Sequence, residues 1–293
     1  MDCGSVKVLV TGSDGFLGRH ACEYWSHHDV TAVDVRSGVD AVEFFKTCDT
    51  GFDLVLHFAA IVGGRATIDG EPLAVAKTTS LDIAMFNWAL RTMPRHVLYP
   101  SSSAAYPVIL QGRTFHRRLA EDDISLLAPH LPDAMYGWVK LTGEHLAARA
   151  REQGLNVHVI RPMSGYGTDQ DTSYPFGKFL ERAKRGDDPF EIWGDGRQVR
   201  DWVHVDDIMA TIDAMVVNNI QSPLNIGTGV ATTFLDFAAR MCEAFGYEPV
   251  FKPLPDKPTG VDWRVANTYL LDEVRKPRIS LDEGIARAVK ACR

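Results

Sequence analysis

The turn TGSDGFLG at residues 11–18 constrains the fold more than any other feature of the sequence. It directly follows an apolar, β-branched run at residues 6–10 and opens a helix-like segment at residues 16–27. In the spacing GxxGxxG, one glycine permits a tight turn, one lets the backbone approach a pyrophosphate, and one lets the helix pack closely on the strand. The N–H groups and the positive dipole end of such a helix attract phosphate. The context therefore favours a dinucleotide-binding turn over a glycine turn that binds nothing.

An acidic residue at the end of the second expected strand, residues 30–35, bears on the kind of dinucleotide. Asp34 lies 16 residues after Gly18. A carboxylate at this place binds the hydroxyls of the adenine ribose and repels the 2′-phosphate of NADP. We therefore expect NAD, although Arg36, two residues further on, keeps NADP as an alternative.

Strand-like and helix-like segments alternate through the first half of the chain. This alternation predicts βαβ units and a parallel sheet, and right-handed crossovers then give a doubly wound, Rossmann-type α/β fold. The expected strands are residues 6–10, 30–35, 53–58, 96–100 and 157–161, and the expected helices are residues 16–27, 39–47, 78–91 and 136–153.

The pattern loosens after Pro162, where turns that contain glycine and proline interrupt the helices. We therefore divide the chain into a dinucleotide-binding domain, residues 1–162, and a smaller mixed substrate-binding lobe, residues 163–293. Two strand-like runs of the second part, residues 199–205 and 224–226, are expected to return to the first domain. Part of residues 199–230 then belongs to the first domain.

The composition excludes several classes of function. The formal net charge is −7, which disfavours a general nucleic-acid partner because phosphate backbones are bound by basic surfaces. No run approaches the roughly 20 apolar residues that span a bilayer, and residues 1–4 lead straight into the first strand without a secretory signal. The five cysteines are scattered and form no CxxC pair. We therefore expect reduced thiols in a cytoplasmic protein, with neither disulfides nor a metal site.

Several segments, in their order and spacing, resemble the extended short-chain dehydrogenases/reductases, in particular nucleotide-sugar epimerases and dehydratases such as the UDP-glucose 4-epimerases. The resemblance covers nearly the whole chain. Residues 99–107 and 194–207 are also similar to the GDP-mannose 3,5-epimerases. The segments are TGSDGFLG at 11–18, DLVLHFAA at 53–60, YPSSSAAYP at 99–107, YGWVK at 136–140, VIRPMSGYG at 159–167, GDGRQVRDWVHVDD at 194–207 and NIGTG at 225–229.

The resemblance implies NAD as the cofactor, held by the glycine turn, by the ends of the next strands and by the catalytic helix. For Asp40 it implies a contact with the adenine amine, although a solvent-exposed role for this carboxylate fits the sequence nearly as well. The implied cofactor contacts are Gly12, Asp14, Gly15, Phe16, Leu17, Gly18, Asp34, Arg36, Asp40, Phe58, Ala59, Ala60, Tyr136, Lys140 and Met163.

A tyrosine and a lysine on one expected helix are the candidate catalytic pair. Tyr136 and Lys140 are four residues apart, so their side chains lie on the same helix face. A neighbouring ammonium favours the phenolate and lowers the pKa of a tyrosine from its usual value of about 10, which makes Tyr136 a candidate general base. By resemblance, the catalytic hydroxyl is that of Ser102, four residues before Tyr106, and Lys140 holds the cofactor ribose. The implied chemistry is hydride transfer between a sugar carbon and the nicotinamide.

Two departures from the family pattern narrow the implied reaction. Where the 4,6-dehydratases carry an Asp-Glu pair directly after the catalytic hydroxyl, this chain has Ser103 and Ala104. Where the 3,5-epimerases carry a cysteine, two residues before Tyr106, the chain again has Ala104. We therefore expect redox-neutral 4-epimerisation of a UDP- or GDP-hexose. An NAD(P)-dependent 4-ketosugar reductase or dehydrogenase and a non-catalytic NAD-binding regulator are the alternatives.

The resemblance also implies contacts with a nucleoside-diphosphate sugar and with a second copy of the chain. The planar guanidinium of Arg200 suits the diphosphate. The implied substrate contacts are Ser103, Ser164, Lys178, Arg200 and Lys257, with Ser164 in the place of the family's usual asparagine. A homodimer is expected through a four-helix bundle of residues 78–91 and 136–153, with Ala84, Phe86, Trp88 and Ala147 as candidate contacts.

Overall fold

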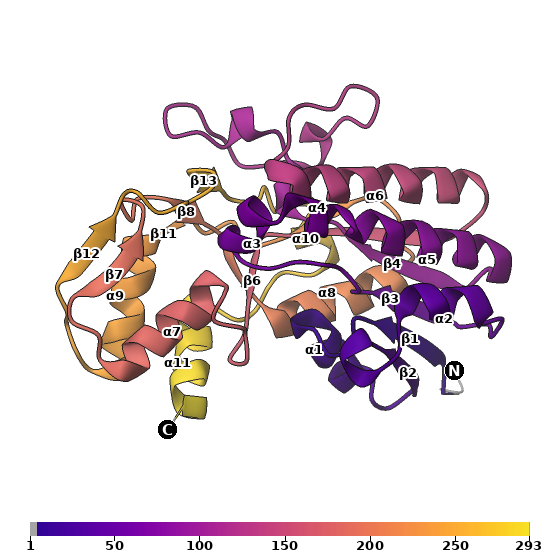
Figure 1. Ribbon diagram of the computed structural model, residues 1–293, viewed down its shortest axis with the longest axis horizontal. Helices are drawn as coiled ribbons and strands as arrows, with labels where there is room; N and C mark the ends of the chain where they lie inside the picture. Colours follow the sequence, from indigo (N-terminus) through magenta and orange to yellow (C-terminus); the bar gives the residue numbers. More distant parts are fainter. Residues whose placement is uncertain (1–4, 293) are drawn as a thin grey trace.

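A six-stranded parallel sheet is the centre of the computed structural model, which describes residues 5–292 (Figure 1). The expectations for residues 1–4, Cys3 included, lie outside the described residues. The strand order is β10-β5-β4-β3-β1-β2, and every neighbouring pair is parallel. The prediction of a doubly wound, Rossmann-type α/β fold is therefore confirmed. The six strands are β1 Lys7–Thr11, β2 Asp29–Val33, β3 Leu54–His57, β4 His96–Pro100, β5 Val157–Pro162 and β10 Leu224–Ile226.

The order of the strands reverses beside β1. The chain runs from β1 to the edge strand β2 and then crosses to β3 on the other side of β1. In open parallel sheets, the crevice outside the carboxyl ends of the strands at such a reversal is where ligands bind. The fold therefore places a binding site beyond Thr11 and His57, the last residues of β1 and β3.

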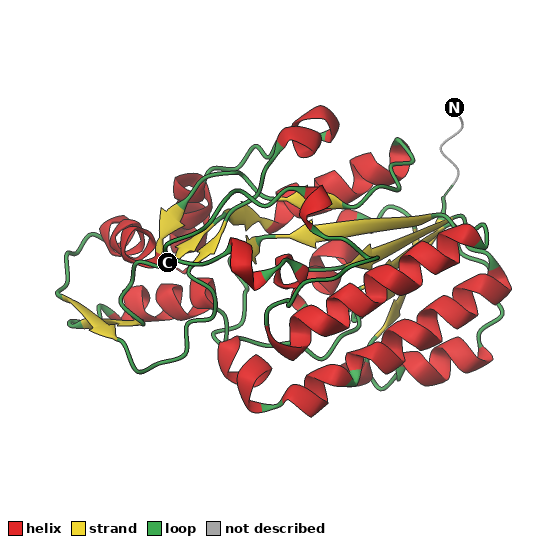
Figure 2. Cartoon of the chain, turned by 90° about the horizontal axis from the view of Figure 1, so that it is seen from above, coloured by secondary structure: helices red, strands yellow, loops and turns green. Residues whose placement is uncertain are grey.

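Helices cover both faces of the sheet (Figures 1 and 2). Side chains alternate along β1, so that Val8 and Val10 pack toward one layer of helices and Leu9 toward the other, all fully buried. Because helices cover both faces of the sheet, a central strand is apolar along most of its length, as residues 6–10 are. The first layer holds α1 Phe16–Tyr24, α8 Val205–Val217 and α10 Tyr269–Val274, and the second holds α2 Ala41–Thr47, α5 Thr78–Thr92 and α6 Ala134–Glu152.

A smaller mixed lobe lies beyond one end of the sheet, on the left in Figure 1. Its core is aromatic, with Phe176, Phe179 and Phe237 packed against Trp202. Its helices are α7 Pro175–Arg185, α9 Phe234–Phe245 and α11 Leu281–Cys292, and its strands are β6 Ser164–Tyr166, β7 Phe190–Trp193, β8 Val199–Arg200, β9 Trp202–His204, β11 Thr232–Thr233, β12 Phe251–Leu254 and β13 Trp263–Arg264. Short elements lie between the strands and helices of the large part: α3 Arg65–Gly70, α4 Pro72–Ala76, and the 3₁₀ turns η1 Val35–Ser37, η2 Ser103–Ala105, η3 Val108–Leu110 and η4 Glu121–Asp123.

The expectation that residues 199–205 form one strand returning to the large sheet is wrong. The run is divided into β8, which pairs with β11 and β13, and β9, which pairs with β6. The division falls at Asp201, whose fully buried carboxylate accepts N–H bonds from Thr228, Gly229 and Ala266. These bonds turn the backbone inward between the two short strands. The later run does join the sheet, since β10 pairs with β5.

Within residues 5–292, no helix combines the length and the apolar character needed to cross a membrane.

Candidate functional site

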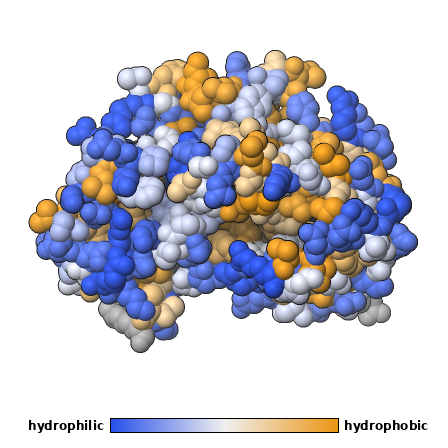
Figure 3. Space-filling view, in the orientation of Figure 1, coloured by the Kyte–Doolittle hydropathy of each residue, from blue (hydrophilic) through white to orange (hydrophobic). Residues whose placement is uncertain are grey.

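One cavity of about 1100 Å³ lies at the reversal of the strand order. Figure 3 shows the surface hollowed between the lobe that holds α7 and the part of the molecule that holds α1. The cavity brings together most of the residues singled out in the sequence. The predicted site residues that line it are Gly12, Gly15, Phe16, Leu17, Gly18, Asp34, Arg36, Asp40, Phe58, Ala59, Ala60, Ser102, Ser103, Tyr136, Lys140, Met163, Ser164 and Arg200.

Three predicted residues do not line this cavity. Asp14 turns away from it and accepts a hydrogen bond from the Ser37 hydroxyl. The Lys178 ammonium is bound to Glu181 one turn further along α7, at 2.6 Å. The Lys257 ammonium lies over the ring of Trp193 in the small lobe, 5.9 Å from its centroid. The expected substrate contacts of Lys178 and Lys257 are therefore not part of this site.

The glycine turn packs so closely on the neighbouring backbone that a side chain does not fit at Gly12 or Gly18. Gly12 has φ +71°, and a Cβ there would lie 2.5 Å from the carbonyl carbon of Phe58 at the end of β3. A Cβ on Gly18 would overlap the backbone of Gly12. α1 begins at Phe16, so its first N–H groups face the cavity with the positive end of the helix dipole. This cradle of bare backbone fits a pyrophosphate.

Two carboxylates lie at the end of the cavity where β2 leads into α2. Asp34 is largely buried, and its oxygens accept N–H bonds from Arg36 at 2.8 Å and Asp14 at 3.0 Å. Its position is therefore fixed on the cavity wall. Asp40 caps α2 by accepting the N–H groups of Val42 and Glu43 at the exposed rim. The structure thus gives Asp40 a helix-capping role in addition to its place on the cavity wall.

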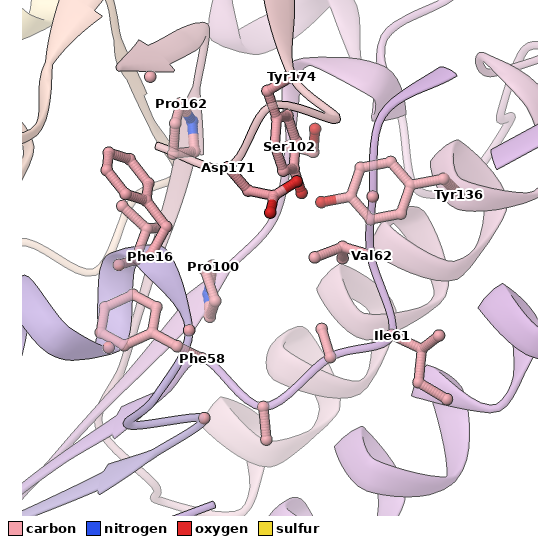
Figure 4. Close-up of a pocket in the computed structure, with 18 of the residues that line it drawn as sticks. Phe16, Phe58, Ile61, Val62, Pro100, Ser102, Tyr136, Pro162, Asp171 and Tyr174 are labelled. Atoms are coloured by element: carbon pink, nitrogen blue, oxygen red, sulfur yellow. The ribbon is translucent and has the colours of Figure 1, made fainter. Parts of the chain in front are cut away.

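Tyr136 and Lys140 lie one turn apart on α6, as their spacing predicts. The Lys140 Nζ is 5.8 Å from the centre of the Tyr136 ring and 5.3 Å from the centre of the Tyr99 ring. Lys140 is 3% exposed, so its ammonium is held between two aromatic rings at the base of the cavity. Figure 4 shows the hydroxyl of Tyr136 pointing into the cavity, toward the side that carries Ser102.

The three successive serines have different surroundings. Ser101 is buried and donates to Glu144, which also forms an ion pair with the buried Arg161. Ser102 accepts the N–H of Ala104 at 3.1 Å as the N-cap of η2, and its side chain faces the cavity. Ser103 is buried on the cavity wall. The choice of Ser102 agrees with this arrangement, because the hydroxyl of Ser101 is committed to a structural network.

A buried polar chain supports the floor of the site. The Tyr99 hydroxyl donates to Asp82 at 2.9 Å, and burial, followed by the charge of Asp82, raises the Tyr99 pKa far above its ordinary value. On the other side of Asp82 lies His57 at 3.3 Å, and His57 bonds to the Thr11 hydroxyl at 2.8 Å. This chain joins the ends of β1, β3 and β4 beneath the glycine turn.

A charged cluster lies at the opposite end of the cavity, and of its members only Arg200 was predicted from the sequence. It is formed by Arg65, Asp133, Arg200 and Arg264, called here the arginine cluster. Asp133, Arg200 and Arg264 line the cavity. Arg200 and Arg264 are register partners on the paired strands β8 and β13, so their side chains are neighbours. These residues come from distant segments without a shared motif, and only the pairing of β8 with β13 brings them together.

Arg200 is buried, and its contacts leave its charge uncompensated. Its guanidinium donates to the backbone carbonyls of Val199, Thr259 and Val261, at 2.8 to 3.2 Å. Burial, then the neighbouring charges of Arg264 and Arg65, lower the pKa of Arg200 to about 9, so that it is still cationic at neutral pH. Among the described residues, no carboxylate lies within ion-pair distance of it. A buried cation of this kind is stabilised by a neighbouring anion.

A segment of the small lobe covers the cavity from outside. Asp169 bonds to Arg19 and His20 on α1, each at 2.8 Å, which fastens this segment to the large part of the molecule. Further along, Asp171 and Tyr174 reach the cavity wall, as Figure 4 shows. Burial, followed by the neighbouring Tyr136, raises the pKa of Tyr174, so its hydroxyl stays protonated. Sequence reasoning missed this covering segment because it carries no motif.

The part of the chain that the structure describes contains no cluster of three or more His, Cys, Asp or Glu side chains able to hold a metal ion.

The comparisons with known proteins agree with this geometry. The sequence profile of the NAD dependent epimerase/dehydratase family matches residues 8–227. The GDP-mannose 3,5-epimerase of Arabidopsis thaliana is 25% identical, over 96% of this chain and 80% of that protein. The dTDP-glucose 4,6-dehydratase of Haemophilus influenzae is 25% identical, over 97% of each protein. A solved UDP-glucose 4-epimerase from Thermotoga maritima, bound to UDP-glucose, superposes with a TM-score of 0.80 at 26% identity and covers 97% of both chains.

Proposed function

Because the chain belongs to the NAD-dependent epimerase/dehydratase family, we propose that it converts a UDP- or GDP-linked hexose into its C4 epimer without net consumption of NAD. The observation that carries the proposal is the combination of an intact catalytic set with uncharged, thiol-free residues at positions 103 and 104. Ser102, Tyr136 and Lys140 line one cavity, and Ser103 and Ala104 stand where the dehydratases and 3,5-epimerases resembled by this sequence carry acids, bases or a thiol.

The proposed roles follow from the positions of the side chains. Tyr136 takes the proton of the C4 hydroxyl, and Ser102 holds that hydroxyl by a hydrogen bond. Lys140, buried beside Tyr136, places a positive charge where the phenolate forms. Bound NAD would supply the redox chemistry, reversible hydride transfer with the sugar carbon. The cradle at Gly12, with Asp34 at the ribose end, fits that cofactor.

The arginine cluster supports a diphosphate as the charged part of the substrate. Arg200 and Arg264 are adjacent on β8 and β13 and face the cavity. Guanidinium groups bind phosphate through two parallel hydrogen bonds. A diphosphate bound there lies in the same cavity as the hydroxyl of Tyr136, so the attached sugar can reach that hydroxyl.

We also propose a homodimer through α5 and α6. The side chains of Ile83 on α5 and of Met135 and Trp138 on α6 are exposed apolar groups on neighbouring helices. Pairing these helices with those of a second copy covers these groups in a four-helix bundle. The contacts first expected from the sequence need correction, because Phe86, Trp88 and Ala147 are buried in the core of the large part. Sedimentation of the purified protein tests this assembly.

Proton NMR tests the proposed reaction. The purified protein is incubated with NAD and a panel of UDP- and GDP-hexoses while the absorbance of NADH is followed in parallel. Formation of the C4 epimer without net NADH is the expected result and identifies the sugar. Stoichiometric NADH, or turnover only of a ketosugar with reduced cofactor, contradicts epimerisation and supports a dehydrogenase or reductase. Binding of NAD without turnover of any sugar supports a non-catalytic regulator.

A further inference from the structure

Both oxygens of one carboxylate in the arginine cluster are occupied by arginines. Asp133 Oδ1 accepts from Arg65 Nη1 at 2.7 Å, and Asp133 Oδ2 accepts from Arg264 Nη2 at 2.8 Å. The Asp133 and Arg264 side chains are 10% and 13% exposed, so the pair is largely shielded from solvent. Burial alone would raise the pKa of Asp133, but Arg264 and Arg65 outweigh it and lower the pKa. Asp133 is therefore an anion throughout the physiological pH range.

The arginine cluster has more positive than negative charge. Arg65 is shared between Asp133 and Asp69, whereas Arg264 has its ion pair with Asp133 and a hydrogen bond to Gln111. Arg200 lies beside Arg264 and, within residues 5–292, has backbone carbonyls alone as hydrogen-bond acceptors. Like charges on directly paired strands repel each other. An incoming anion relieves this repulsion, but it must compete with Asp133 for Arg264.

Asp133 also belongs to the start of the catalytic helix. It is the N-cap residue of α6, yet within the described chain its carboxylate makes no capping bond and is engaged by the two arginines instead. Ala134, the next residue, has φ +55°, a conformation that alanine rarely adopts. The backbone of Asp133 donates to the carbonyl of Ala104 at 2.9 Å and accepts from Gly137 at 3.0 Å. Asp133 thus binds the arginines through its side chain and the serine turn and the helix of Tyr136 through its backbone.

We propose that Asp133 is a positioning residue that competes with the substrate diphosphate for Arg264 and so couples occupancy of the arginine cluster to the alignment of Tyr136. This inference rests on the proposed function, because it takes a diphosphate as the ligand of the cluster. When the diphosphate binds, Arg264 passes from the carboxylate of Asp133 to the phosphate oxygens. The strained start of α6, three residues before Tyr136, is then released from that tether.

Removal of the Asp133 carboxylate should change anion affinity and turnover in opposite directions. Anion affinity should rise because the competitor for Arg264 is lost, and turnover should fall because the coupling to Tyr136 is lost. Asp133→Asn keeps the shape of the side chain but frees Arg264, which lines the cavity, so anions bind more tightly, whereas Arg65 keeps its ion pair with Asp69. Turnover falls, because diphosphate binding no longer changes the tether at the start of α6. A merely structural role for Asp133 predicts instead that loss of the carboxylate loosens the cluster and weakens anion binding.

Isothermal titration of the full-length protein with bound NAD tests the proposal, with UDP, GDP and inorganic pyrophosphate as probes. For Asp133→Asn, we expect about tenfold tighter binding of the nucleoside diphosphate than for the wild type. The turnover number for the sugar identified by NMR is expected to fall by about the same factor. Asp69→Asn is the matched control, because Asp69 also pairs with Arg65, at 2.6 Å, but does not line the cavity. It should leave both quantities unchanged.

Unchanged or weaker binding by an Asp133→Asn variant that still melts cooperatively and binds NAD overturns the proposal. If that variant does not fold, Asp133→Ser, which removes the charge and retains a side chain able to cap α6, is measured in the same way. Failure of the proposed function looks different. In that case neither the wild type nor the variant binds any of the three probes, and both conclusions are then wrong.

Discussion

The glycine turn is made by consecutive residues, whereas the arginine cluster is assembled from segments that are far apart in the sequence. Gly12, Gly15 and Gly18 shape the backbone between β1 and α1, and their spacing alone reveals the turn. The arginine cluster depends on the pairing of β8 with β13 and on the docking of α3 against the start of α6. The first site is a property of local backbone geometry, and the second is a property of the completed fold.

The largest effect is expected at Tyr136, where the two sites meet. Tyr136→Phe removes the hydroxyl that points into the cavity but keeps the ring beside Lys140. Loss of a general base lowers turnover by about 10² to 10⁴-fold. NAD affinity should stay within a factor of about two, because the turn that holds the pyrophosphate is untouched. Turnover by NMR and NAD titration by fluorescence measure the two quantities.

Tyr269→Phe is the control for the loss of turnover in Tyr136→Phe, because it removes a tyrosine hydroxyl outside the site. Tyr269 is 69% exposed at the start of α10 and lies outside the cavity. Tyr269→Phe should leave turnover and NAD binding as they are in the wild type. Retention of turnover by Tyr136→Phe would remove Tyr136 from the catalytic set and favour the non-catalytic regulator.

The next largest effect is expected on nucleoside diphosphate binding, when Arg200, which lines the cavity, is compared with Lys178, which the sequence also predicted as a substrate contact. Arg200→Met removes a buried cation, and nucleoside diphosphate binding should weaken by about 100-fold. Lys178→Met is the matched control, because Lys178 pairs with Glu181 away from the cavity. Calorimetric titration with UDP and GDP measures both variants. Equal losses in the two variants would show that the anion does not enter the arginine cluster.

The sequence predicted the sheet and the glycine turn because both are encoded locally. The run at residues 6–10 is buried on both faces, and its apolar character follows directly from that position. Asp34 was found because it ends the next strand, and Tyr136 and Lys140 because helical spacing places them together. In each case the signal lies within a few residues of the structure that it predicts.

Most of the remainder depended on contacts that no local pattern encodes. Residues 199–205 look like one strand, but Asp201 is drawn inward by N–H groups from residues 228, 229 and 266. Asp133 is an ideal residue for an N-cap, yet its carboxylate is taken by Arg65 and Arg264. Lys178 and Lys257 look like basic substrate contacts until their partners Glu181 and Trp193 are known. Partners from other segments decided these outcomes except for Lys178, whose partner Glu181 lies one turn further along the same helix.

A smaller effect is expected for a substitution within the glycine turn. Gly12→Ala places a Cβ against the backbone of Phe58 at a positive φ, which costs about 1–3 kcal/mol of unfolding free energy. NAD affinity should fall by about tenfold, since the backbone no longer approaches the pyrophosphate closely. Gly51→Ala is the control, because its Cβ meets nothing within 4 Å. Urea unfolding and NAD titration compare the two, and equal stability would show that the turn tolerates a side chain.

The smallest effect is a pH dependence that only the arginine cluster should show. The pKa of Asp133 is lower in the folded protein, because Arg264 and Arg65 outweigh the effect of burial. Its ionised form therefore stabilises the fold above the pKa of an unfolded aspartate, about 4, and this contribution disappears as the pH falls through the lower folded pKa.

The wild type should thus exceed Asp133→Asn in unfolding free energy by about 1 kcal/mol near pH 6, and the gap should close as the pH falls below about 4. Gly51→Ala, which changes no titratable group, should keep a constant gap to the wild type over the same range. Urea unfolding at a series of pH values measures these differences. A difference in unfolding free energy between the wild type and Asp133→Asn that stays constant down to pH values at which carboxylates are protonated would mean that the two arginines do not stabilise the charge of Asp133. The stability of the arginine cluster would then be independent of charge, as we expect for the glycine turn.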